Sequence, residues 1–168
     1  MKTYTINKGC HYNTSLFERL TSYSKKSMSG YAMLTSSCWY DRTTYGTHIN
    51  KLKGFSSDLF NKNSNRLGWR PSLVKNEFEI YVYKHINGLY ERGDMLRDDL
   101  ICTVKADMDW AFDISPVERE NKMSYSANFS NVITDFPVDK MGTGWLMGFY
   151  FGGKPTAPWK MTAQTRAT

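Results

Sequence analysis

The sequence has no long hydrophobic run. Its richest apolar stretch, residues 145–151, is seven residues long and includes Gly148. A membrane-spanning helix needs roughly 20 mostly apolar residues, so we expect none here and no membrane partner. The start of the chain, MKTYTINKGCHYNTS, also lacks the apolar stretch of a cleaved secretory signal. We therefore expect a protein that is not secreted by a signal peptide.

The residues that usually fill cores are scarce, because Leu, Ile, Val and Phe together account for 33 of 168 residues. Eleven Tyr and five Trp must therefore supply much of the buried surface. An aromatic content of 15% excludes a disordered chain. A chain of this length can bury a core without disulfides or metals. We expect one domain that spans residues 1–168.

Cysteine and histidine are few and badly spaced for metal binding. No pair has the short spacing of a structural zinc site, and there is no C-x-x-C motif. Without a secretory signal, we expect reduced thiols. We therefore expect no metal and no cofactor. The residues concerned are Cys10, Cys38, Cys102, His11, His48 and His85.

Motifs of nucleophilic or nucleotide-dependent catalysis are also missing, since there is no Gly-x-Ser-x-Gly elbow and no Walker loop. Paired carboxylates remain, because Glu77 and Glu79 alternate along one expected strand and would share a face. Two carboxylates that are two residues apart on one strand face have a separation that suits glycoside hydrolysis. The same pair is equally typical of a solvent-facing strand surface. We assign no catalytic residue and expect a non-enzymatic protein.

The clearest structural element present is Glu77–Ile86, where Phe78, Ile80 and Val82 alternate with polar residues. This period of two predicts a half-buried strand. Asn87-Gly88 follows at once and predicts a tight hairpin turn, with a returning strand that starts at Leu89.

Short extended segments separated by Gly, Asn and Pro recur along the rest of the chain. Residues 16–23 alone suggest one or two helical turns. The pattern predicts an all-β fold, a single antiparallel β-sandwich or jelly roll with at most one or two short helices. The other expected strands cover residues 2–7, 31–40, 54–60, 100–114, 123–133, 145–151 and 157–165.

Charge is unevenly distributed. Residues 1–75 hold 12 Lys or Arg against 3 Asp or Glu, and residues 76–168 hold 10 against 13, within a net charge of +6. A basic half can attract a polyanion. Alternatively, the two halves interleave in the sheets and the charges mix on the surface.

The segment with the strongest binding character covers residues 61–71, NKNSNRLGWRP. We expect a loop there, in which amides and Arg read hydroxyl or acidic groups while an aromatic face stacks on a sugar or base. Arg42, Lys51 and Lys53 would add positive charge. The alternative is a capped surface loop whose Trp69 fills the core. The predicted ligand-binding residues are Asn63, Ser64, Asn65, Arg66, Trp69 and Arg70.

A second segment, residues 150–162, contains Gly152-Gly153 and two prolines, which indicate a loop that leads to the last strand. As a functional alternative, Tyr150 and Trp159 would form a further aromatic wall beside a ligand.

Four blocks together resemble small uncharacterised proteins encoded by tailed phages of Bacteroidota and related hosts. They are KGFS at 53–56, NSNRLGWRP at 63–71, FEIYVYKHING at 78–88 and YFGGKPTAP at 150–158. Lys8-Gly9-Cys10-His11 is similar to the start of some members. The resemblance implies a viral origin and a β-sandwich rather than an activity. Histidines typical of that group are replaced here by Asn61-Lys62 and Trp159-Lys160.

Three functions follow for this chain. The first is a non-enzymatic virion protein, made in the host cytoplasm, which decorates the capsid, associates with a fibre or binds a surface glycan. Its partners would be phage structural proteins or that glycan, and a homo-oligomer is plausible. The second is a phage counter-defence protein that binds a nucleotide signal or nucleic acid. The third is a jelly-roll enzyme that cleaves glycans with Glu77 and Glu79.

Overall fold

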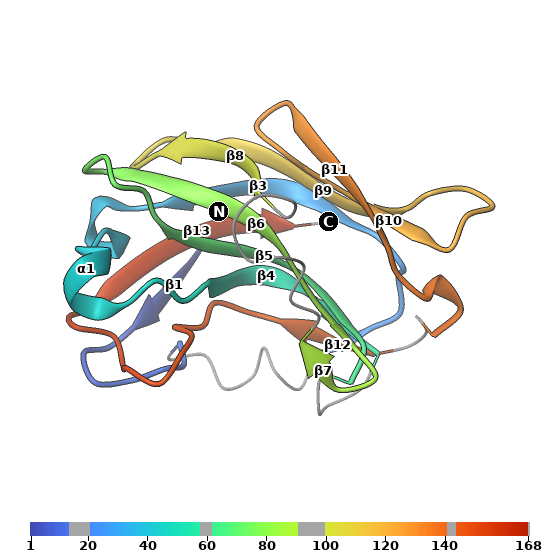
Figure 1. Cartoon of the computed structure of the whole chain (residues 1–168), viewed down its shortest axis with the longest axis horizontal. Helices are drawn as coiled ribbons and strands as arrows, with labels where there is room; N and C mark the ends of the chain where they lie inside the picture. The colour runs from blue at the N-terminus through green and yellow to red at the C-terminus, as the bar shows by residue number, and fades with distance from the viewer. Residues whose placement is uncertain (14–20, 58–61, 91–99, 141–143, 168) are drawn as a thin grey trace.

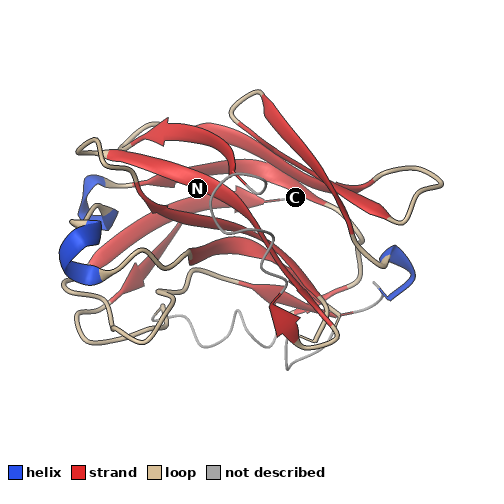
Figure 2. Ribbon diagram, in the orientation of Figure 1, coloured by secondary structure: helices blue, strands red, loops and turns tan. Residues whose placement is uncertain are grey.

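The computed structural model describes residues 1–13, 21–57, 62–90, 100–140 and 144–167. Within these residues nearly all regular structure is β-strand (Figure 2). The exceptions are the four-residue helix α1 (Arg42–Tyr45) and the short 3-10 segments η2 (Ser36–Cys38) and η3 (Val138–Lys140). In this part of the chain, no helix has the length and apolar character needed to cross a membrane.

The strands form two antiparallel sheets that pack face to face (Figure 1). The six-stranded sheet has the order β1 (Lys2–Ile6), β13 (Met161–Ala167), β3 (Met28–Leu34), β9 (Trp110–Pro116), β10 (Lys122–Ala127) and β11 (Ser130–Asp135). The seven-stranded sheet has the order β2 (Ser22–Tyr23), β12 (Gly144–Met147), β4 (Asn50–Ser56), β5 (Ser64–Pro71), β6 (Glu77–Ile86) and β7 (Leu89–Tyr90), and β8 (Leu100–Lys105) also pairs with β6. The predicted all-β sandwich is confirmed.

Strand β6 and its hairpin are as predicted. Phe78, Ile80 and Val82 are buried in the core between the sheets, and the polar residues of β6 lie on the opposite face. The turn has φ of 54° at Asn87 and 82° at Gly88. Two positive φ angles characterise the tight turn that suits the twist of paired strands. It sets Ile86 opposite Leu89 and His85 opposite Tyr90, the two residues of β7.

Two long extended segments are each divided by a turn. Residues 100–114 form β8 and β9, which belong to different sheets, with Asp107 at a positive φ of 59° between them. Met108, just after this turn, is exposed, whereas Trp110 and Phe112 are buried. Residues 123–133 form β10 and β11 around a turn at Asn128 and Phe129.

Of the predicted helical segment, residues 14–20 lie outside the described residues, and Ser22–Tyr23 is strand β2.

The segment expected to be a binding loop is instead a central strand. Strand β5 pairs along its length with both β4 and β6, and its residues are buried on both faces. Trp69 is fully buried and stacks on Phe149, with ring centroids 5.7 Å apart. Phe78 and Tyr40 meet the same indole edge to face. The predictions of a loop, and of Trp69 as a ligand wall, are therefore wrong, and the alternative that Trp69 fills the core is correct.

Aromatic side chains carry much of the core, as the shortage of aliphatic residues requires. Two buried tyrosine hydroxyls are paired with amides: Asn50 donates to the hydroxyl of Tyr40 at 2.9 Å, and the hydroxyl of Tyr125 donates to Asn65. Such pairing avoids the free-energy cost of a buried unsatisfied group. Asn65 therefore serves the core rather than a ligand.

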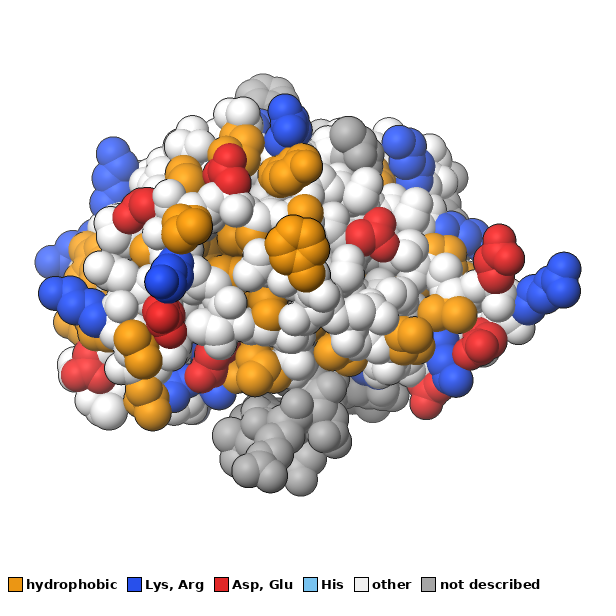
Figure 3. Space-filling model, turned by 90° about the horizontal axis from the view of Figure 1, so that it is seen from above, with side chains coloured by type: hydrophobic (Ala, Val, Ile, Leu, Met, Phe, Trp, Pro, Cys, Tyr) orange, Lys and Arg blue, Asp and Glu red, His pale blue; other side chains and the backbone are white. Residues whose placement is uncertain are grey.

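Positive and negative side chains are interspersed on the surface above β8, β9 and β11, and hydrophobic side chains are scattered among them (Figure 3). The basic N-terminal half and the acidic C-terminal half also interleave in the sheets, since β3 pairs with β9 and β5 pairs with β6.

Replacing Trp69 by Ala should destabilise the protein by about 3–5 kcal/mol, because it leaves a large cavity between the sheets. Urea unfolding followed by circular dichroism measures this. The matched control is Phe129→Ala, whose ring is fully exposed; it should change stability by no more than about 0.5 kcal/mol. Equal effects of the two substitutions would contradict this account of the core.

Candidate functional site

A β-bulge in β4 sends two lysines to opposite faces of the seven-stranded sheet. Lys51 lies opposite Gly68 and Lys53 lies opposite Leu67, so Leu52 is an extra residue in β4. In a regular strand Lys51 and Lys53 would share a face, because side chains alternate with a period of two. Here Lys51 faces outward, away from the core, and Lys53 points between the sheets.

On this outer face Lys51 belongs to what we call the cation–tyrosine cluster: Lys51, Arg66, Tyr83 and Tyr150. The Lys51 ammonium lies 4.7 Å from the ring centroid of Tyr83 and 4.7 Å from that of Tyr150. The Arg66 guanidinium lies 5.8 Å from the Tyr83 ring centroid. These distances are those of cation–π contacts.

The backbone fixes this arrangement. Arg66 and Tyr83 are directly opposite one another on β5 and β6. Tyr150 is tied to β4 by two hydrogen bonds, from Lys51 N to Tyr150 O and from Tyr150 N to Lys51 O, both at 2.9 Å. The cluster therefore rests on strand pairing rather than on a loop.

Two glycines allow the cluster to pack closely. A Cβ atom at Gly68 would lie 2.5 Å from Cγ2 of Ile49 and 3.3 Å from Cβ of Tyr83. A Cβ atom at Gly152 would lie 3.0 Å from the Lys51 ammonium. A side chain at either position would clash with Ile49 and would crowd Tyr83 or the Lys51 ammonium.

Within the described ranges, the two cations have no anionic partner. Among the described residues, no hydrogen bond or ion pair reaches the Lys51 ammonium or the Arg66 guanidinium, although Arg66 is only 5% exposed. The Arg66 Nε and the neighbouring Ser64 hydroxyl are both buried without a hydrogen-bond partner. Uncompensated charge of this kind is costly, and an anionic ligand would offset the cost.

The pKa values of Lys51 and Arg66 reflect the burial of these two cations. Burial lowers the pKa of Lys51 from 10.5 to about 8, and the charge of Arg66 contributes a smaller part of this shift in the same direction. Burial lowers the pKa of Arg66 to about 10, although Tyr83 and Tyr150 act in the opposite direction. At neutral pH the cluster therefore carries two positive charges.

Aromatic rings extend the cluster towards solvent. His11 stacks on Tyr150 with ring centroids 5.6 Å apart, and Tyr12 meets Tyr150 edge to face at 4.8 Å. His11 donates through Nδ1 to the carbonyl of Phe151 at 2.9 Å, which fixes its ring. Because Tyr12 is 52% exposed, this row leads from the buried cations to the surface.

A second group of charges on the same face is neutralised. One oxygen of Glu79 accepts from Arg70 Nε at 2.6 Å, from Arg42 at 3.0 Å and from the Tyr81 hydroxyl at 2.6 Å. Burial raises the pKa of Glu79, but these hydrogen bonds and the two Arg charges outweigh it, so its pKa lies below the ordinary value. Arg42 and Arg70 therefore serve an ion-pair network rather than a free ligand.

The structure places the six predicted ligand residues in different environments. Arg66 belongs to the cluster and Ser64 lies beside it. Asn65 and Trp69 face the core, and Arg70 pairs with Glu79. Asn63 accepts from the backbone N–H of Asn87 at 3.1 Å and so supports the β6–β7 hairpin.

Sequence reasoning missed Tyr83 and the role of Gly68. Tyr83 lies on the polar side of the β6 alternation, and an aromatic residue among charged ones was the available signal. Of the predicted aromatic wall, Tyr150 joins the cluster. Trp159 instead donates to the carbonyl of Ser37 at 2.7 Å and packs on Tyr45. Of the three accessory cations, Lys51 lies in the cluster, whereas Lys53 and Arg42 lie elsewhere.

Metal binding has no geometric basis in the described residues, where no three His, Cys, Asp or Glu side chains gather. His48 lies between Tyr40 and Phe151. Burial, followed by the charges of Lys51 and His11, lowers its pKa to about 4, so it is neutral at pH 7.

Comparison with known proteins gives remote structural likeness only. No family model and no curated protein matches the chain. A Pseudomonas aeruginosa alginate lyase matches with a TM-score of 0.48 and 12% identity over 84% of this chain, which spans 63% of the lyase. The carbohydrate-binding module CBM66 of Bacillus subtilis matches with a TM-score of 0.37 and 11% identity, over 98% of this chain and 78% of that module.

A Ruminococcus gnavus sialidase module, CBM40, bound to α2,3-sialyllactose, matches with a TM-score of 0.35 and 10% identity, over 98% of this chain and 90% of that module. At such identities and TM-scores, the likeness assigns no ligand or activity to this chain.

The pKa of Lys51 is directly measurable. Its side-chain NMR signals should titrate with a midpoint near pH 8, and Arg66→Met should raise that midpoint because it removes a neighbouring cation. Since the unfolded chain keeps a pKa near 10.5 at this lysine, Lys51 should also make the protein less stable as pH falls from 10.5 to 8. A wild-type midpoint at 10.5 would contradict the burial of this charge.

Proposed function

We propose that the protein is a non-enzymatic binding protein that holds an acidic glycan at the cation–tyrosine cluster. The observation that carries the proposal is the pair Lys51 and Arg66, two partly or fully buried cations without an anionic partner among the described residues, beside two tyrosine rings. A sugar carboxylate would accept hydrogen bonds from both cations, and Arg is well suited to bind it with two donors.

The tyrosine rings supply the second half of such a site. Sugar rings present apolar C–H faces, and an exposed aromatic side chain stacks on them. Tyr12 and Tyr150 form a continuous aromatic row beside the cations. A neutral sugar would gain only the aromatic contact, whereas a uronic or sialic acid would gain the charge contact as well. Selectivity for acidic glycans follows from this difference.

A binding role, rather than a catalytic one, agrees with the ionised state of Glu79 on the outer face of the seven-stranded sheet. Glu79 accepts three donors and has a lowered pKa, so it is poorly suited to donate a proton to a leaving group. The hypothesis of a glycan-cleaving enzyme that uses Glu77 and Glu79 thus has less support than simple binding.

Binding can be measured by calorimetry with a galacturonic acid tetrasaccharide and a neutral galactose tetrasaccharide. The acidic one should bind and the neutral one should bind at least about tenfold more weakly, as expected from the loss of one charge-assisted contact. Lys51→Met and Arg66→Met should each weaken acidic binding by about 10- to 100-fold. Neither should lower the melting temperature, because each removes an uncompensated charge.

Matched controls distinguish an effect at the cation–tyrosine cluster from a general effect of removing a charge or a tyrosine. Lys105→Met removes an exposed lysine of β8, and Tyr31→Leu removes an exposed tyrosine of the other sheet; neither should alter binding. If both tetrasaccharides bind alike, or neither binds, the proposal fails. A nucleotide that raises the melting temperature while the acidic glycan does not would instead support the nucleotide-binding alternative.

Association with a phage particle is a separate proposal, which rests on the sequence resemblance. Mass spectrometry of purified virions should detect the protein if it decorates the capsid or accompanies a fibre. Its presence in the infected-cell lysate but not in purified particles would contradict a virion location.

A further inference from the structure

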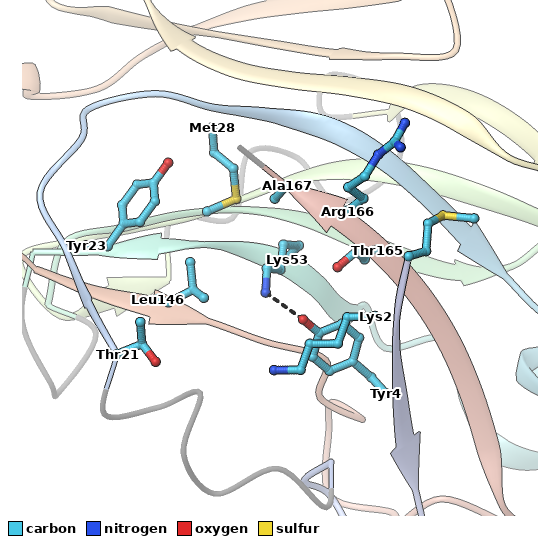
Figure 4. A pocket seen from close by; sticks show the side chains of 11 residues that line it. Lys2, Tyr4, Thr21, Tyr23, Met28, Lys53, Leu146, Thr165, Arg166 and Ala167 are labelled. Carbon is cyan, nitrogen blue, oxygen red and sulfur yellow. Dashed lines mark hydrogen bonds between the residues drawn. The ribbon is translucent and has the colours of Figure 1, made fainter.

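A pocket of about 530 Å³ opens at one edge of the sandwich (Figure 4), and none of the four residues of the cation–tyrosine cluster lines it. Its walls come from β1, β3 and β13 of the six-stranded sheet and from β2, β4 and β12 of the seven-stranded sheet. The two sheets therefore diverge at this edge instead of closing on each other. The volume lies within the range of small-molecule sites, about 300–1,000 Å³.

Lys53 reaches into this pocket because of the bulge in β4. It is only 3% exposed, and its ammonium donates to the hydroxyl of Tyr4 at 3.1 Å. The same ammonium lies 4.9 Å from the Tyr4 ring centroid, and that of Lys2 lies 5.3 Å from it. The bulge therefore places a positively charged hydrogen-bond donor between the two sheets.

The charged side chains among the described residues that line the pocket are all positive. Lys2, Lys53 and Arg166 contribute, and no Asp or Glu occurs among the described residues that line the pocket. The Arg166 guanidinium turns towards the Tyr31 ring, 5.1 Å from its centroid, and so lies at the rim. The positive charge inside the pocket therefore comes from Lys53 and Lys2.

Thr165 provides an independent observation. It is 2% exposed, it lines the pocket, and its hydroxyl has no hydrogen-bond partner. Leaving a buried hydroxyl unsatisfied costs about 1–3 kcal/mol. A ligand oxygen in the pocket would satisfy it. Thr165 and Lys53 both line the pocket (Figure 4).

The other part of the pocket is apolar. Figure 4 shows Met28, Tyr23 and Leu146 on the side of Lys53 away from Tyr4 and Lys2. Met28 is 1% exposed, and the Tyr23 ring packs on Phe55 with centroids 5.3 Å apart. This wall is continuous with the core, so it suits the hydrocarbon part of a ligand.

We propose that this edge pocket binds a small amphipathic carboxylate, with its acid group at Lys53 and Thr165 and its apolar body against Met28, Tyr23 and Leu146. The carboxylate accepts a hydrogen bond from the Thr165 hydroxyl and from the Lys53 ammonium. The site is distinct from the cation–tyrosine cluster, because the bulge puts Lys51 and Lys53 on opposite faces of the sheet. The two ligands therefore bind independently.

Octanoate and 1-octanol are suitable probes, because they share an apolar chain and differ in the acid group. Titration of each into the full chain, followed by NMR, should show that octanoate binds at least about tenfold more tightly than octanol. Lys53→Met keeps the apolar stem and should reduce this preference by about tenfold or more. Lys51→Met, at the cation–tyrosine cluster, should leave octanoate binding unchanged.

Thr165→Val supplies a second variant that does not depend on the lysine. It should raise the melting temperature of the free protein, since it removes an unsatisfied buried hydroxyl, and it should weaken octanoate binding about fivefold or more. Equal binding of octanoate and octanol, or failure of both probes to bind, would overturn the proposal. So would octanoate binding that Lys53→Met and Thr165→Val both leave intact.

Discussion

The single extra residue in β4 is the constraint on which both candidate sites depend. Successive side chains of a strand point to opposite faces of the sheet. The extra residue Leu52 therefore reverses the faces of the side chains on one side of the bulge relative to those on the other. Lys51 therefore joins Arg66 on the outer face while Lys53 enters the edge pocket beside Tyr4. Without the bulge, both lysines would lie on one face, and one of the two sites would lose its principal cation.

Cations on the outer face of the seven-stranded sheet differ in what balances them. Arg42 and Arg70 surround Glu79, and this network is complete without any ligand. Lys51 and Arg66 contact aromatic faces instead, which attract cations but do not neutralise them. The incomplete electrostatics of the second group, rather than the amount of positive charge, distinguish a candidate binding site from structural support.

Sequence patterns predicted the elements whose two faces differ clearly. Strand β6 alternates between core and polar residues, and Asn87-Gly88 specifies its turn. Strand β5 escaped prediction because Ser64–Pro71 mixes polar, charged and aromatic residues, as loops do. In the structure β5 lies between β4 and β6 with both faces buried, and its Arg side chains pack against tyrosines or Glu79. Such burial depends on neighbours far along the chain, which local pattern does not reveal.

The sequence by itself determined an antiparallel β fold with an aromatic core, because alternation, turn residues and composition are local properties. It also singled out Arg66 as a candidate binding residue. Only the tertiary structure decided which residues surround that arginine. Lys51, Tyr83 and Tyr150 come from separate segments, and strand pairing brings them together. Tertiary contacts also assigned Trp69 to the core and Lys53 to a pocket between the sheets. The physical reason is that register and bulges, set by pairing between distant strands, decide the face on which each side chain lies.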